Sequence, residues 1–342
     1  MSQGRKVYLE AMRVIAVILV IYNHTDGFVY YTVTDNIITY LFSLSMSVLC
    51  RAAVPLFFMI TGALLLEREE SLSELMKKRV LRMIVVLFTI SLAYYIFDLI
   101  LDRIENAGIM DFVIRLISNG TRESFWFLYS YLFMLLLLPF FRKMAPFLNG
   151  QLIRYLMCLM ALSSFFVPLI NMWCGVSFTF DVGFAGGYFY YVLLGYFMSH
   201  DGKEVFQKMK TSVLCLCLIG LIALNMLIMY LLNQRCGAYQ TAGLDFFVFL
   251  TAPLIWLIME HVTRKIPGQS KLNKGICTLG SCVFGIYLLD NFLRWQFLPV
   301  YLYLTEKTIG VLACSVYIAL VFGVGFLYTW ILKRIPGVRR YL

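Results

Sequence analysis

The sequence predicts an all-α, polytopic integral membrane protein with about ten transmembrane helices and both termini in the cytoplasm. Three observations predict this fold class: the apolar share of the composition, ten long apolar segments, and an uneven distribution of basic residues. Of the 342 residues, 61% are hydrophobic and only 14% are charged, and the mean hydropathy is +0.81. No soluble core buries so large an apolar share, so the composition excludes a soluble enzyme or binding domain.

The apolar segments have roughly the 20 residues that an α-helix needs to cross a bilayer. They run near residues 8–29, 37–66, 80–101, 125–141, 153–173, 183–199, 212–232, 245–262, 277–298 and 308–332. The first has no small-residue cleavage site, so we expect a retained span and not a cleaved signal peptide. In the second, Pro55 lacks a backbone N–H and predicts a kink. We expect residues 1–342 to form a single transmembrane domain without an appended soluble domain.

One long loop interrupts this pattern, at residues 102–124. Its MDFVIRLI stretch has the spacing of an amphipathic helix, and we expect that helix to lie along the membrane surface.

Basic residues mark the cytoplasmic side, because cytoplasmic loops carry an excess of Lys and Arg. With the N-terminus inside, 20 of the 29 basic residues fall in cytoplasmic segments and 5 in outer segments. The other four, Arg13, Arg51, Arg82 and Arg294, lie within spans or at their ends. This bias predicts an even number of spans, and it accounts for the net charge of +10 without a nucleic-acid partner.

The first span carries the charges around which we expect a site. Arg13 and His24 are eleven positions apart. At about 100° per residue their side chains project within about 20° of each other, roughly 16 Å apart along the axis. Ionisable groups inside a span usually face a bundle interior or a water-filled path, which indicates a functional site. The alternative is that Arg13 reaches the cytoplasmic headgroups and His24 is a polar residue near the outer interface.

Few other polar residues are expected at membrane depth. Arg51, in the second span, is far from either surface. Arg79 and Arg82 are neighbours on one helix at the cytoplasmic face, where paired guanidiniums suit either phosphates or anionic lipid headgroups. Asp290 falls in the ninth span, and Trp126 opens the fourth. An aromatic such as Trp126 suits a sugar site or an interfacial belt.

These motifs occur together in one family. Arg13 and His24 with ten residues between them, the RxxR of Arg79 and Arg82, and the stretches RAAVPLFFMITGALLL, FWFLYSYL, FGIYLL and WILKRIPGVRRYL resemble the membrane acyltransferase-3 family. The resemblance runs from about residue 8 to the C-terminus. Members are bacterial integral membrane proteins that O-acylate cell-surface carbohydrates. The Arg before VPLFF is most similar to members without an appended hydrolase domain, such as those that acetylate the enterobacterial common antigen.

The resemblance implies an enzyme of the bacterial inner membrane that moves an acetyl or other short acyl group from cytoplasmic acyl-CoA to a carbohydrate hydroxyl. The acceptor would be a surface polysaccharide or a lipid-linked glycan. His24 would be the catalytic histidine with Arg13 as its partner, and Arg79 and Arg82 would bind the donor, with Arg51 as a further cation. A neutral imidazole suits a general base near pH 7. Direct activation of the acceptor and a covalent acyl-histidine both stay open.

The chain departs from the family pattern at two positions. Asp290 stands where many members have a histidine, and it is expected to orient His24, to neutralise an arginine, or to be a polar residue at a helix end. Glu10 stands where the family often has Asp, three residues before Arg13, a spacing that allows an ion pair.

Two other functions stay open. One is succinyl transfer within the same family. The other is a transporter or flippase in which His24 relays protons and four charged residues line a path, namely Arg13, Arg51, Asp98 and Asp290. We see no internal repeat, which argues against the second.

The remaining expectations concern cysteines and partners. The nine cysteines show no metal-ligand spacing, so we expect no metal. Whether Cys174 and Cys236, both near outer loops, form a disulfide is left open. Membrane lipids are expected partners besides the acyl-CoA and the glycan.

Overall fold

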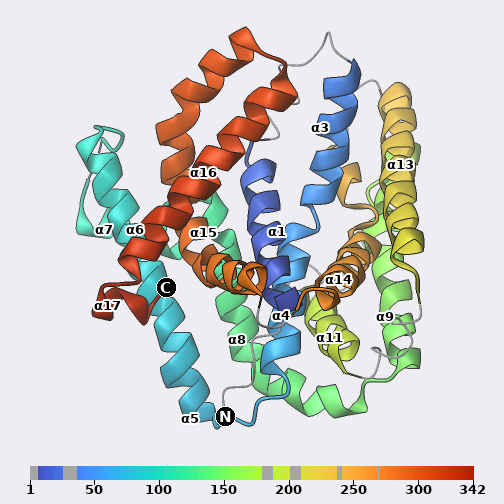
Figure 1. Cartoon of the computed structure of the whole chain (residues 1–342), viewed down its shortest axis with the longest axis horizontal. Coiled ribbons are helices and arrows are strands. Elements are labelled where there is room, and N and C mark those ends of the chain that lie inside the picture. Colours follow the sequence, from blue (N-terminus) through green and yellow to red (C-terminus); the bar gives the residue numbers. More distant parts are fainter. Residues whose placement is uncertain are drawn as a thin grey trace. The chain divides into compact units, whose positions relative to one another are not determined.

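The computed structural model describes residues 7–25, 37–105, 107–178, 188–200, 209–236, 241–267 and 270–342, and the regular elements in these ranges are helices (Figure 1). They form two compact units, Met1–Leu64 with Phe147–Ile331 and Leu65–Pro146 with Leu332–Leu342. The all-helical prediction is confirmed.

The first unit is built around α1 (Val7–Asn23). This helix packs against α15 (Lys271–Lys307), α14 (Val248–Arg264) and α3 (Ile37–Cys50). Its residues Met12, Ala16, Val17 and Ile21 have no exposed surface. The other helices of this unit are α4 (Ala53–Leu65), α9 (Gly150–Ala161), α10 (Val167–Cys174), α11 (Tyr188–Ser199), α13 (Thr211–Cys236) and α16 (Gly310–Leu332). The helix that carries Glu10 and Arg13 is therefore central and buried in this unit.

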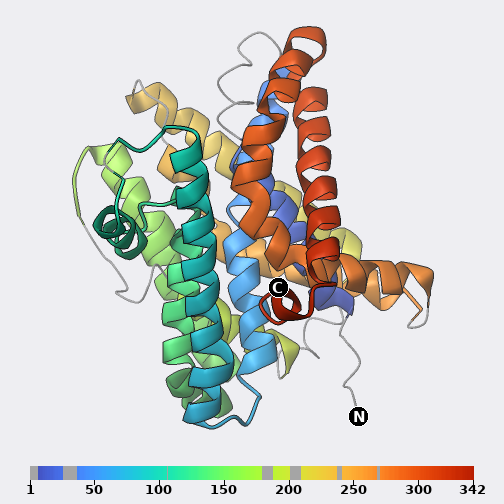
Figure 2. The same ribbon diagram turned by 90° about the vertical axis from the view of Figure 1, so that its left-hand side faces the viewer.

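The second unit contains a long helix pair. It begins with α5 (Leu72–Leu75), which Ser71 and Glu74 cap reciprocally, and continues through a π-helical turn, Met76–Val80, into α6 (Leu81–Ile100). α8 (Trp126–Met144) lies beside α6 (Figure 2). The unit also holds α7 (Ile109–Ile117) and α17 (Pro336–Arg339).

The helices agree with the predicted spans. Each of the ten segments falls on a helix, and within the described ranges seven helical segments are long and apolar enough to cross a membrane. The helices α1, α11 and α14 are shorter, with 17, 12 and 17 residues. The protein is thus a multi-pass membrane protein, while the number of crossings and the side of the termini stay predictions.

Some predicted features lie outside the described residues. They are residues 26–29 and 183–187 of the first and sixth predicted spans and the basic residues Arg5, Lys6, Lys203 and Lys208.

The ninth span differs most from its prediction. We expect 277–298 from the apolar window, but α15 has 37 residues and runs from Lys271 to Lys307. The Ser270 side chain accepts a hydrogen bond from the N–H of Asn273 and caps the helix earlier than the apolar run begins. The helix extends beyond the window at both ends, through KLNKGI before it and PVYLYLTEK after it, so the window underestimates its length.

The second predicted span is interrupted just before Pro55, the residue for which the sequence predicts a kink. The helix α3 ends at Cys50 and α4 begins at Ala53, with a turn between them at Arg51 and Ala52. Pro55 has no N–H to donate to the carbonyl of Arg51, four residues earlier, and its ring crowds that carbonyl. Pro55 itself sits in the first turn of α4, where proline is tolerated. The kink is therefore a full break, and it places Arg51 between two helices.

The helix expected in the loop 102–124 is present as α7. Phe112 is buried, while Ile109 and Ile117 are 86% and 76% exposed, so one apolar flank faces outward. The Tyr95 hydroxyl ties α7 to α6, since it accepts from the N–H of Gly108 and lies 3.0 Å from Asp111 Oδ2. Its place along the membrane surface stays a prediction.

The possible disulfide between Cys174 and Cys236 is not formed. Cys174 and Cys236 are both free and exposed. The Cys236 thiol instead donates to the carbonyl of Met172 at 3.4 Å.

Two glycines let α4 and α11 approach each other closely. A Cβ atom on Gly62 would lie 1.8 Å from the carbonyl oxygen of Val192, and one on Gly195 would lie 2.0 Å from that of Met59. Both obstacles are backbone atoms, which cannot rotate away. Small residues at such contacts are typical of helices packed in membranes.

We predict that Gly195→Ala destabilises the protein by about 1 to 3 kcal/mol, because the added methyl group forces α4 and α11 apart. The matched control is Gly220→Ala on α13, where a Cβ would meet nothing within 4 Å. That control should be neutral or gain about 0.5 to 1 kcal/mol. Thermal unfolding of the detergent-purified variants checks this. A Gly195→Ala protein as stable as Gly220→Ala would contradict the close approach.

Candidate functional site

His24 stands at the end of α1 and contacts a carboxylate from another helix. Its backbone N–H still donates to the carbonyl of Val20 at 3.1 Å, so the helical path continues to it. Its Nδ1 lies 2.6 Å from Oδ2 of Asp290. Asp290 comes from α15 and is only 1% exposed, whereas the His24 side chain is 20% exposed. The histidine is therefore held from the buried side and accessible on the other.

A second cation completes this contact. Arg294, one turn further along α15, donates its Nε–H to the same Asp290 oxygen at 3.1 Å. Its Nη1 donates to the backbone carbonyl of His24 at 3.3 Å. From α16, the hydroxyl of Tyr317 donates to the carbonyl of Arg294 at 2.7 Å. Three helices thus fix the position of one imidazole.

The contacts determine which ring nitrogen carries the hydrogen. Oδ2 of Asp290 accepts from the guanidinium of Arg294, so it acts as an acceptor toward His24 as well. Nδ1 of His24 therefore donates, and in the neutral ring Nε2 keeps its lone pair. An imidazole held in this way can accept a proton at Nε2.

Asp290 has one more feature. Its second oxygen, Oδ1, is buried and has no hydrogen-bond partner in the described part of the chain. Of the three roles expected for Asp290, its contacts agree with two, since it lies against His24 and pairs with Arg294. Its part in a reaction stays a prediction.

Arg13 and Glu10 form the ion pair that their spacing predicts. Arg13 Nη1 lies 2.9 Å from Glu10 Oε1. Glu10 is buried against α15, where a Cβ on Gly280 would come within 2.3 Å of Glu10 Oε2. Glu10 with Gly280 and His24 with Asp290 are two contacts in the same order along α1 and α15. The two helices therefore run in the same direction, as expected of a first and a ninth span.

Arg51 lies at the break between α3 and α4 and faces a carboxylate. Its Nε is 3.8 Å from Oδ1 of Asp245, which ends the short helix Thr241–Asp245 before α14. Within the described residues that Nε is buried without a hydrogen-bond partner. The pair is too long for a hydrogen bond, so it leaves capacity for a polar ligand.

The predicted donor residues Arg79 and Arg82 belong to the second unit. Arg79 lies in the π-helical turn Met76–Val80, and such turns inside α-helices are frequent at functional sites. Its Nε–H donates to both oxygens of Glu70, at 2.9 and 3.2 Å. This leaves its two terminal nitrogens outside the contact with Glu70.

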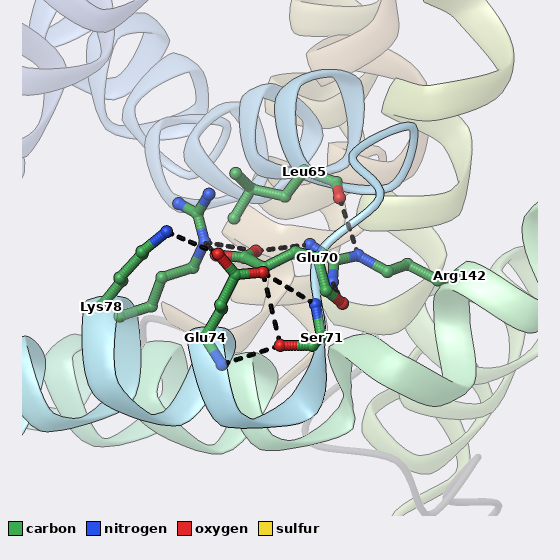
Figure 3. A network of polar contacts seen from close by, with 7 residues as sticks. Leu65, Glu70, Ser71, Glu74, Lys78 and Arg142 are labelled. Atoms are coloured by element: carbon green, nitrogen blue, oxygen red, sulfur yellow. Dashed lines mark hydrogen bonds and ion pairs between the residues drawn. The ribbon is translucent and has the colours of Figure 1, made fainter.

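Glu70 is shared between two arginines (Figure 3). Arg142, at the end of α8, donates to Glu70 Oε2 at 2.8 Å and to the backbone carbonyls of Leu65 and Glu70. Burial alone would raise the pKa of Glu70, but the hydrogen bonds and charges of Arg142 and Arg79 outweigh it and hold that pKa below its ordinary value. One carboxylate thus orients Arg79 and joins α8 to the segment before α5.

The other predicted residues have different surroundings. Arg82 Nη2 donates to the backbone carbonyl of Tyr341 at 3.2 Å. Trp126 begins α8, is 38% exposed and belongs to the second unit, and its part in an acceptor site stays a prediction. Asp98 is held in the second unit by both terminal nitrogens of Arg122, at 2.6 and 2.7 Å.

Four contributing residues had no predicted role: Arg294, Asp245, Glu70 and Arg142. The periodicity of α15 carries a signal for Arg294, because it lies four residues after Asp290 and shares its helix face. The other three act across long sequence separations, which no local pattern shows. In the described ranges, no three His, Cys, Asp or Glu side chains gather as ligands for a metal.

Comparison with protein families matches residues 6–334 to the family Acyl_transf_3, described as an acyltransferase domain. No curated protein and no solved structure matches the chain. The matched range contains all residues of the His24 site and both predicted donor arginines.

The lowered pKa of Glu70 predicts a pH-dependent stability. A carboxylate with a lower pKa in the folded state contributes stability that is fully present above its unfolded pKa, about 4.3, and is lost as pH falls through the folded pKa. Glu70→Gln should therefore lower the melting temperature at pH 7, and its difference from the unmodified protein should shrink below about pH 4. Thermal unfolding at both pH values measures this.

The control for Glu70→Gln is Glu69→Gln, an exposed neighbour in the same segment. It should change the melting temperature little at either pH. An equal loss for Glu70→Gln at pH 7 and in acid would refute the ionic origin of the effect.

Proposed function

The chain belongs to the membrane acyltransferase-3 family, as its motifs predict, and on this premise we propose that it transfers an acetyl or other short acyl group from acyl-CoA to a carbohydrate hydroxyl. The acceptor is a surface polysaccharide or a lipid-linked glycan, and the enzyme works in the cytoplasmic membrane of a bacterium. The observation that carries this proposal is the hydrogen bond between His24 Nδ1 and Asp290 Oδ2, which leaves Nε2 as a base.

His24 has the chemistry that acyl transfer to a hydroxyl requires. Nε2 removes the proton from the attacking hydroxyl as its oxygen bonds to the thioester carbon. When the carbon–sulfur bond breaks, the imidazolium returns this proton to the departing thiolate, so the products are an ester and a free thiol. General base catalysis of this kind contributes about 10² to 10⁴-fold in rate.

Asp290 and Arg294 support the charged form of the imidazole. The Asp290 carboxylate lies on the Nδ1 side and stabilises the positive charge that forms on His24 during proton transfer. Arg294 fixes that carboxylate and binds the backbone carbonyl of His24, which limits rotation of the pair. This arrangement supports direct activation of the acceptor. In the covalent alternative, the Nε2 lone pair attacks the thioester carbon first.

The arginines suit the phosphates of the donor. Arg79 and Arg82 of the second unit have guanidinium nitrogens beyond those engaged by Glu70 and Tyr341. Guanidiniums bind phosphate oxygens through charge-assisted, bidentate hydrogen bonds. Arg79 meets its carboxylate only through Nε, whereas Arg13 uses the terminal nitrogen Nη1, so we assign the donor phosphates first to the RxxR pair. Arg51 lies 3.8 Å from Asp245 and is a further candidate, as its Nε has no hydrogen-bond partner in the described residues.

We predict that purified protein given acetyl-CoA and a glycan acceptor releases free CoA, and that His24→Ala slows release by about 10² to 10⁴-fold because the base is gone. Thiol detection measures release, and a mass increase of the acceptor confirms transfer. The matched control is His261→Ala, a histidine in the last turn of α14. It should keep the rate of the unmodified protein.

The outcomes separate the open alternatives. Release of CoA without acceptor would indicate an acyl-histidine, and release only with acceptor would indicate direct transfer. A protein that moves a glycan across the membrane without changing its mass, and leaves every short acyl-CoA intact, would refute acyl transfer in favour of a carrier. Succinyl-CoA tested beside acetyl-CoA decides between the two acyl groups.

We further predict that Asp290→Asn lowers kcat by about 100-fold or more and leaves the affinity for acyl-CoA unchanged, since the amide no longer stabilises the imidazolium. Arg294→Gln keeps the contact between Asp290 and His24 and should reduce kcat less. Steady-state kinetics with a separate CoA-binding measurement checks both variants. Equal losses of kcat and of CoA affinity in Asp290→Asn would mean that Asp290 serves only the fold.

A further inference from the structure

The segment after α16 folds against the RxxR pair in the second unit. Pro336 begins α17, and the N–H groups of Val338 and Arg339 donate to the carbonyl of Ile335. The N–H groups of Tyr341 and Leu342 in turn donate to the carbonyl of Val338. The chain is thus wound into successive turns at its C-terminal end, where Figure 1 labels α17. Arg82 Nη2 donates to the carbonyl of Tyr341 at 3.2 Å.

This fold brings the guanidinium of Arg340 near Arg82, which also senses the charge of Arg79. Arg340 directly precedes the residue that Arg82 binds, and the charges of Arg79 and Arg340 both act on Arg82. Like charges repel, and the repulsion grows where little water surrounds them. An anion bound among them would remove that cost.

The available counter-charge is small. In the described part of the chain, the hydrogen-bond partner of Arg82 is a neutral carbonyl oxygen. Glu70 engages Arg79 through Nε, but it also pairs with Arg142, so one carboxylate serves two arginines. The group of Arg79, Arg82 and Arg340, here termed the arginine cluster, therefore carries excess positive charge.

We propose that Arg340, placed by the contact between Arg82 and Tyr341, is the third guanidinium of a polyphosphate site formed with Arg79 and Arg82. The site takes a pyrophosphate or a nucleotide bearing several phosphates. This inference rests on the proposed function, in which the ligand is the acyl-CoA donor. That donor carries three phosphate groups, two in its pyrophosphate and one on its ribose. The RxxR pair has two guanidiniums and can bind only two of these groups bidentately. The Tyr341 carbonyl positions the segment and does not touch the phosphates.

The test measures phosphate binding by the full chain in nanodiscs of zwitterionic lipid. The probes are acetyl-CoA, acetyl-pantetheine without phosphates, and inorganic pyrophosphate. The variants are Arg340→Gln and, as a matched control, Arg339→Gln, which removes the same charge from the preceding residue of α17. We expect Arg340→Gln to weaken acetyl-CoA and pyrophosphate about tenfold, the value of one charge-assisted hydrogen bond. Arg339→Gln should change neither, and acetyl-pantetheine should bind both variants alike.

The outcomes distinguish this inference from the proposed function. If the unmodified protein binds pyrophosphate through Arg340 but no acyl-CoA, the polyphosphate site stands and the donor assignment fails. If Arg340→Gln and Arg339→Gln have equal effects, or if Arg340→Gln changes neither phosphate probe, the inference is refuted. Nanodiscs with anionic phospholipid test the other source of phosphate. An effect of Arg340→Gln on lipid association alone would make Arg340 a headgroup contact and refute the site.

Discussion

The structure depends on one constraint: a charge placed at membrane depth must find a partner inside the protein. Asp290 is buried and has two such partners, His24 and Arg294. Because its partners come from α1 and α15, the pairing also decides how these two helices are aligned. Glu10 and Arg13 follow the same rule near the other end of α1, where Gly280 leaves room for the carboxylate. Electrostatic pairing and close helix packing are therefore parts of one arrangement.

In the second unit, one carboxylate, that of Glu70, is shared by two arginines. Glu70 neutralises part of the charge of Arg79 and Arg142 while leaving this end of the helix pair strongly basic. A carboxylate that binds Arg79 through Nε determines the orientation of the planar guanidinium without occupying its terminal nitrogens. The same basic residues therefore enter two predictions: the orientation of the chain by the positive-inside rule, and the proposed binding of an anion by oriented guanidiniums.

The sequence predicts the features that depend on local spacing. Apolar runs locate the helices, Pro55 locates the break in the second span, and the three-residue spacing of Glu10 and Arg13 predicts their ion pair. Local spacing does not predict the pairing of His24 with Asp290, because 266 positions separate them and no periodicity connects two different helices. The family resemblance offers it only as one of three roles for Asp290. The role of Glu70 is hidden for the same reason, since Arg142 lies 72 positions away. The π-helical turn at Arg79 is also invisible in the sequence, because it changes the helix face by one extra residue without any special residue type.

The long separation between His24 and Asp290 has a consequence for biosynthesis. α1 leaves the ribosome first, and α15 follows only after most of the chain has been made. Until α15 inserts, the imidazole of His24 lacks its carboxylate, and Asp290 has no place in the bilayer that suits its charge. The contact between His24 and Asp290 is therefore formed near the end of translation. A ribosome that stalls before residue 290 releases a chain that carries His24 but not Asp290, so this contact cannot form until the membrane domain is almost complete.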